Sequence, residues 1–153
     1  MIILFLTSGL LLGWSLGAND AANVFGSAVG SKMLSFRKAA LIASVFVIIG
    51  AVVQGAGASD TLGRLGAVNA IGGSFTVALA AAIVVYMMTK FSLPVSTTQS
   101  IVGAIIGWNL FTGNTTDGGT LTRILSTWVS GPVLGAVFAV ILYILLKALK
   151  RKS

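Results

Sequence analysis

Residues 2–23 read IILFLTSGLLLGWSLGANDAAN, an apolar run that ends in a glycine and a cluster of Asn and Asp. The run is apolar enough for a membrane helix, and Gly17 followed by polar residues predicts that a first helix over 1–31 is broken at this point. A carboxylate inside an apolar stretch, such as that of Asp20, is costly in lipid unless it is paired or binds something. We therefore expect a membrane protein with a functional site beside this break.

The composition of the whole chain supports a membrane protein. The 153 residues are 56% hydrophobic and only 8% charged, with 19 glycines, which is far too apolar for a soluble domain. Further apolar windows follow at 39–58, 70–89, 91–111 and 121–149, and about 20 apolar residues suffice to cross a bilayer. We predict an all-α integral membrane protein with about five crossings, folded as a single domain over 1–153.

The residue inventory excludes several function classes. There is no Cys and no His, which removes thiol chemistry, imidazole acid–base catalysis and the usual zinc sites. Ten Lys and Arg against three acidic residues give a net charge of +7, but the basic residues lie between and after the apolar windows instead of forming a basic stripe with aromatics. We therefore expect no enzyme, no cofactor and no nucleic-acid partner.

The basic residues predict the orientation in the cell membrane. The loop 32–38 carries three of them and should be cytoplasmic, because the connections at 59–69 and 112–120 carry almost no positive charge. An odd number of crossings then places the N-terminus outside and the basic tail 147–153 in the cytoplasm. A second homologous half joined in sequence would enter with the opposite orientation, as in inverted-repeat transporters.

Asp20 is the only acid inside an apolar stretch. On one helical turn, Asn19 and Asn23 are four residues apart, and Asp20 and Asn23 are three apart, so the carboxylate and amide oxygens project to one side. Hard oxygen ligands suit a cation such as sodium. A break at Gly17 would also free backbone N–H groups for an anion. The alternative is that Asp20 only caps a helix that begins near Ala21.

Residues 94–100 read PVSTTQS and interrupt the apolar window 91–111 near its start. Proline is common at the first position of a helix, so free N–H groups and the positive end of a helix dipole are expected here. With the hydroxyl groups they would form a site that fits a tetrahedral oxyanion. One alternative is a capping cluster whose hydroxyls bond to the backbone. The window could also cross as a discontinuous span or return as a re-entrant hairpin.

These two segments resemble the two signatures of the inorganic phosphate transporter (PiT) family. The first is GANDAAN at 17–23, continued by FGSAVGS at 25–31, and the second is PVSTTQSIVGAIIG at 94–107. They occur in the family's order, and the resemblance extends through Trp128 and 130–132. Members of the family are cation-coupled symporters of inorganic phosphate, mostly with sodium and sometimes with protons. They consist of two inverted halves that each carry both signatures.

The resemblance implies a role for each matched polar residue. It implies phosphate binding by Asn19, Asp20, Ser96, Thr97, Thr98 and Gln99, and sodium binding by Asp20, Asn23, Asn19, Ser96 and Thr97. The family commonly has His where this chain has Gln99. A titrating imidazole is therefore absent, and the anion or the coupling ion could differ.

The chain resembles one half of such a transporter, most like the N-terminal one. This implies symport of phosphate with sodium or protons, together with a second, inverted half that is a separate subunit, a copy of this chain or further sequence. We expect a separate partner, because an antiparallel homodimer needs a dual topology that the charge bias disfavours. The alternatives are a permease for sulfate or a related oxyanion, and a membrane subunit or sensor that transports nothing.

Overall fold

All regular structure in the described residues is α-helical. The computed structural model describes residues 2–66, 68 and 71–150. The helices are α1 (Ile2–Gly30), α2 (Phe36–Leu65), α3 (Ile71–Lys90), α4 (Thr97–Thr112) and α5 (Gly118–Lys150). The prediction of an all-α chain is confirmed. Within the described ranges, α2, α3 and α5 are long and apolar enough to cross a membrane, while the crossing count of about five stays a prediction.

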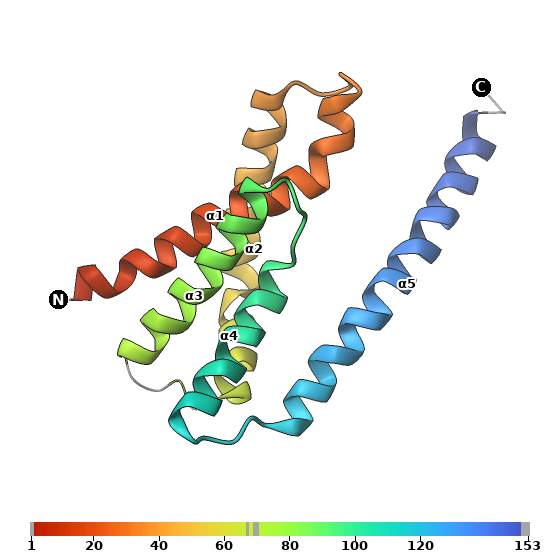
Figure 1. The fold of residues 1–153 in the computed structure, drawn as a ribbon. Helices are drawn as coiled ribbons and strands as arrows, with labels where there is room; N and C mark the ends of the chain where they lie inside the picture. Colours follow the sequence, from red (N-terminus) through yellow and green to blue (C-terminus); the bar gives the residue numbers. More distant parts are fainter. Residues whose placement is uncertain (1, 67, 69–70, 151–153) are drawn as a thin grey trace. The chain divides into compact units, whose positions relative to one another are not determined.

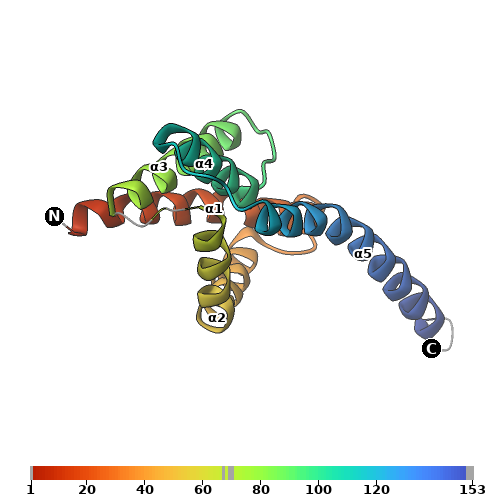
Figure 2. The same ribbon diagram turned by 90° about the horizontal axis from the view of Figure 1, so that it is seen from below.

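The chain divides into two compact units, Met1–Thr116 and Asp117–Ser153. In the first unit, α3 packs against both α1 and α4, and Figures 1 and 2 show these three helices side by side, with α2 projecting away from the α3–α4 pair. The second unit is α5 with the residues at its ends. Its first turn is capped by Asp117, whose carboxylate accepts a hydrogen bond from the Thr120 N–H at 2.6 Å.

The core of the first unit lies between α3 and its two neighbours. Ala81, Ala82 and Val85 of α3 are completely buried, and Val102 and Ile105 of α4 are nearly so. Small residues allow this close packing, because a small side chain lets two helix backbones approach. Gly73 shows how close the approach is, since a Cβ atom there would lie only 2.8 Å from the Trp108 ring.

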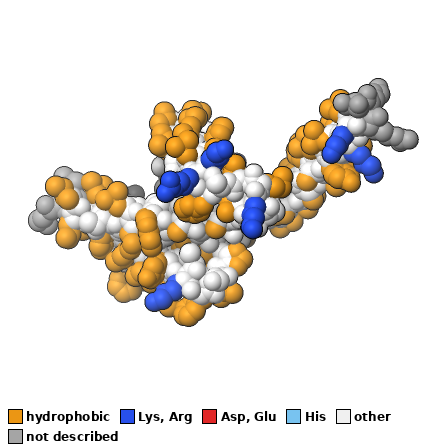
Figure 3. All heavy atoms as spheres, turned by 90° about the horizontal axis from the view of Figure 1, so that it is seen from above, with side chains coloured by type: hydrophobic (Ala, Val, Ile, Leu, Met, Phe, Trp, Pro, Cys, Tyr) orange, Lys and Arg blue, Asp and Glu red, His pale blue; other side chains and the backbone are white. Residues whose placement is uncertain are grey.

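Outside this core, large hydrophobic side chains are exposed along most of the helices. Figure 3 shows groups of hydrophobic side chains over much of the face in view, with Lys and Arg in a few separate places. Such an extent of exposed apolar surface is unusual for a protein in water, whereas it is expected where lipid is the solvent.

The first helix corrects one expectation. The predicted break at Gly17 is absent, because α1 is one continuous helix from Ile2 to Gly30, and Figure 1 shows it changing direction in its second half without an interruption. A glycine inside a helix costs only about 1 kcal/mol relative to alanine. Asn19 and Asp20, which follow Gly17, also find hydrogen-bond partners without any unwinding of the helix, as described below.

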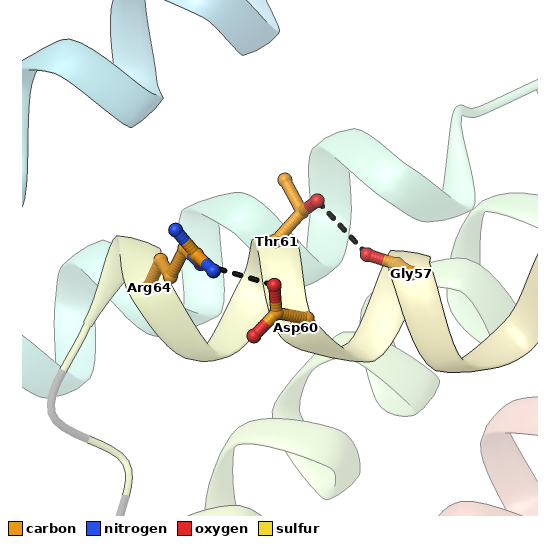
Figure 4. Close-up of polar contacts among 4 residues, drawn as sticks. All are labelled: Gly57, Asp60, Thr61 and Arg64. Atoms are coloured by element: carbon orange, nitrogen blue, oxygen red, sulfur yellow. Dashed lines mark hydrogen bonds and ion pairs between the residues drawn. The ribbon is translucent and has the colours of Figure 1, made fainter.

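The structure also corrects the expectation of a polar connection at 59–69, because most of this segment is helical. Helix α2 continues to Leu65, and Asp60 and Arg64 form an exposed ion pair one turn apart, with Nε and Oδ2 separated by 3.0 Å (Figure 4). Thr61 donates its hydroxyl to the Gly57 carbonyl on the same stretch. These side chains keep their polar groups satisfied within a helix, so a polar composition did not end it. Residues 67, 69 and 70 of this connection lie outside the described residues.

The window 91–111 divides between a non-helical link and a helix. Helix α3 ends at Lys90, and α4 begins at Thr97 and continues to Thr112, so the link 91–96 contains the interruption and α4 does not fold back on itself. At the other end of the chain, Lys147 and Lys150 lie in the last turn of α5, while residues 151–153 of the basic tail lie outside the described part.

Candidate functional site

The candidate site lies where the middle of α1 meets the link 91–96 and the start of α4. Asn19 is only 4% exposed. Its amide group donates from Nδ2 to the Val95 carbonyl at 2.5 Å and accepts from the Val95 N–H at 3.4 Å. Both backbone groups of Val95 are therefore paired with one side chain from α1. This contact joins two segments that are 76 residues apart in sequence.

The Asp20 carboxylate is the charged group of the site. Its Oδ1 atom accepts from Asn19 Nδ2 at 2.7 Å and from the Thr97 hydroxyl at 3.2 Å. Thr97 is 3% exposed, whereas Asp20 is half-buried. The hydrogen bonds of the described residues leave Oδ2 without a donor, and the ion pair found among these residues joins Asp60 and Arg64 instead. A half-buried carboxylate with one open oxygen is suited to bind a cation.

The start of α4 combines a helix cap with free donors. Ser96 is the N-cap, and its hydroxyl accepts from the Gln99 N–H at 3.3 Å. The Ser100 hydroxyl donates to the Ser96 carbonyl at 3.1 Å. The hydroxyls of Ser96 and Ser100 therefore bond to the backbone, as the capping alternative predicts. The N–H groups of Thr97 and Thr98 have no acceptor within the described residues, so the positive end of this helix remains available to an anion.

The structure brings together only some of the polar residues that the sequence predicts for the site. Asn19, Asp20 and Thr97 meet directly, and Ser96 adjoins them as the cap of α4. Asn23, although it lies one turn beyond on α1, is exposed and makes no side-chain hydrogen bond with the described residues. Likewise exposed are the side chains of Thr98 and Gln99 on α4.

The sequence did not predict two polar features of the structure, the role of the Val95 backbone and the burial of Asn109. The backbone of Val95 is central to the site, but a valine carries no sign of this in its side chain. Asn109 is fully buried at the far end of α4, where its Nδ2 donates to the Thr116 hydroxyl at 2.9 Å. Its Oδ1 has no hydrogen-bond partner in the part of the chain that is described. An isolated Asn near a helix end resembles an ordinary cap, so no sequence signal marked it as buried.

Comparison with known proteins shows which family this chain is similar to. The sequence profile of the phosphate transporter family matches residues 16–153. A protein of Pyrococcus horikoshii named as a candidate phosphate permease is 36% identical over 161 residues, which cover 98% of this chain and 39% of that protein. A Mycobacterium tuberculosis protein named in the same way is 32% identical over 96% of this chain and 30% of its own length.

A relative from Plasmodium falciparum is named as a sodium-dependent phosphate transporter. It is 31% identical over 97% of this chain and 24% of its own length. The chain thus spans at most about two fifths of the length of these relatives. No solved structure matches it.

Proposed function

Because the chain belongs to the phosphate transporter family, we propose that it forms one half of a cation-coupled symporter of inorganic phosphate. The observation that carries the proposal is the Asp20 carboxylate, which is held by Asn19 and Thr97 through one oxygen and leaves the other open. Sodium is the proposed coupling ion, since its preferred ligands are carboxylate, hydroxyl and carbonyl oxygens. A relative named as a sodium-dependent phosphate transporter supports this choice.

The anion is proposed to bind at the start of α4. There the N–H groups of Thr97 and Thr98 and the exposed side chains of Thr98 and Gln99 offer donors to a tetrahedral oxyanion. Thr97 has a hydroxyl on Asp20 and a backbone N–H in this first turn. The cation site and the anion site would therefore share one residue.

This arrangement gives a physical reason for coupling. A phosphate anion about 5 Å from an unneutralised Asp20 would be repelled by roughly 3 kcal/mol at the effective dielectric constant usual for proteins. A cation bound at Oδ2 removes this repulsion. Phosphate then binds about a hundredfold more tightly when the cation is present, and by linkage the cation binds more tightly when phosphate is present.

A second, inverted half is proposed to complete the transport path. The relatives are more than twice as long as this chain, which leaves room for another unit of similar size. The charge bias of the loops favours a separate partner over an antiparallel copy of this chain. Sulfate is the second candidate anion, because the donors at Thr97 and Thr98 suit either tetrahedral oxyanion.

The test begins with binding, because the residues proposed to hold the ions all belong to this chain. The purified chain of 153 residues is titrated with radioactive sodium, with and without phosphate or sulfate. Asp20→Asn should weaken sodium binding at least tenfold, since it removes the charge and keeps the shape. Asp60→Asn is the matched control, because Asp60 is exposed in its ion pair with Arg64 and its change should leave sodium binding unaltered.

Transport is then measured in proteoliposomes that contain this chain together with the proposed second half, as uptake of labelled phosphate and sulfate with and without a sodium gradient. Uptake that needs no sodium and survives Asp20→Asn would refute the mechanism. A chain that assembles normally but binds neither anion would instead be a subunit without transport activity.

A further inference from the structure

The first unit has a groove between α1 and α3. It is a groove of about 210 Å³ lined by Trp14, Ser15 and Ala18 of α1 and by Tyr86, Thr89 and Lys90 of α3. None of these side chains takes part in the hydrogen bonds around Asp20. The groove is therefore distinct in its residues from the proposed ion and phosphate site.

Two aromatic rings form the wall of the groove. The ring centroids of Trp14 and Tyr86 are 5.8 Å apart and the rings are tilted by 37°. Trp14 is 59% exposed, so much of its ring is free to contact another molecule. The indole N–H has no acceptor among the described residues. Trp and Tyr with an apolar body and a free polar edge are typical of the boundary between lipid chains and headgroups.

A single cation provides the charge of the groove. Lys90 is the last residue of α3, is exposed, and forms no ion pair with any described residue. The hydroxyl of Thr89 donates to the Val85 carbonyl at 2.8 Å, and that of Ser15 lies 3.5 Å from the Ala82 carbonyl. Because both hydroxyls are turned to the backbone, the ammonium group of Lys90 is the principal donor for a ligand.

We propose that this groove binds an anionic phospholipid. The phosphate of the headgroup lies at Lys90, and the glycerol and the first part of an acyl chain lie along Trp14 and Tyr86. Lysine at the end of a membrane helix attracts anionic lipid headgroups. The positive charge disfavours a choline group on the aromatic rings, although these rings alone would attract one.

Free inorganic phosphate is a poorer match for the groove. One ammonium group and aromatic walls cannot replace the hydration shell of a free dianion, and burying an incompletely paired charge is costly. A phospholipid keeps the outer part of its headgroup in water and brings apolar surface to Trp14 and Tyr86. The chemistry of the walls therefore selects the lipid.

The test uses the whole chain of 153 residues in vesicles, with Trp14 as the reporter. Its fluorescence is obtained as the difference between the chain and Trp14→Phe, which leaves the contributions of the other two tryptophans to cancel. Quenching is compared for phosphatidylglycerol and phosphatidylcholine that carry bromine on their acyl chains. We expect about a fivefold preference for phosphatidylglycerol, as one lysine near a membrane surface provides.

Two charge variants decide whether the preference belongs to the groove. Lys90→Gln should reduce the preference to near unity, whereas Lys38→Gln, which removes the same charge from the start of α2, should retain it. Equal quenching by both lipids, or an equal loss in the two variants, would overturn the proposal. So would displacement of the brominated lipid by inorganic phosphate, or a Trp14 that neither lipid quenches because protein covers the groove.

Discussion

Replacing Asn19 with alanine tests how the site is held together. The change removes the amide that pairs with both backbone groups of Val95 and that donates to Asp20 at 2.7 Å. An unpaired buried backbone group costs about 1–3 kcal/mol. The substitution leaves two such groups without their partner, the N–H and the C=O of Val95. Because Val95 is only partly buried, each group should cost an amount in the lower half of this range, so we expect Asn19→Ala to lower the free energy of unfolding by about 3 kcal/mol in total.

The matched control is Asn23→Ala, since both asparagines belong to the same short motif on α1. Asn23 is exposed and makes no side-chain hydrogen bond with the described residues, so its loss should change stability by less than about 0.5 kcal/mol. Unfolding is followed in mixed detergent micelles by circular dichroism. Equal destabilisation by the two substitutions would refute the view that Asn19, and not Asn23, joins α1 to the link 91–96.

Further predictions concern packing and acid titration. Gly73→Ala should destabilise the chain by about 1–3 kcal/mol, because its Cβ would lie 2.8 Å from Trp108. The control Gly72→Ala should be neutral or mildly stabilising, because its Cβ meets nothing within 4 Å. Thermal unfolding of the two variants in detergent tests the difference. Hydrogen bonds from the Thr120 side chain and backbone lower the pKa of Asp117 below its usual 3.8. The stabilising effect of these hydrogen bonds is therefore present above pH 3.8 and is lost as the pH falls through the lowered pKa. Thr120→Ala should raise the pKa of Asp117, measured by infrared titration. An unchanged pKa would contradict this prediction.

The sequence alone determined the helical membrane character of the chain and the location of its two polar segments. Both follow from local properties. In lipid, backbone groups must find their hydrogen bonds inside the same segment, so a long apolar stretch is committed to a helix wherever it packs. Likewise, a carboxylate such as Asp20 stands out in an apolar stretch without any knowledge of its neighbours.

Helix boundaries were less accessible to this reasoning. Gly17 and the polar residues 59–65 looked like breaks, yet both lie inside continuous helices. A glycine costs a helix little, and Asp60 and Arg64 satisfy each other one turn apart. Composition records such residues as polar or flexible, but only the contacts they make determine whether a helix ends.

Only the tertiary structure decided which polar groups work together. Asn19 and Asn23 are the same residue in the same motif, but Asn19 reaches the backbone of Val95, 76 residues away in sequence, while Asn23 remains exposed. The groove at Trp14, Tyr86 and Lys90 likewise exists only because α1 and α3 pack together. Helix formation is local, whereas the pairing of side chains depends on how distant segments meet, and no short stretch of sequence records that meeting.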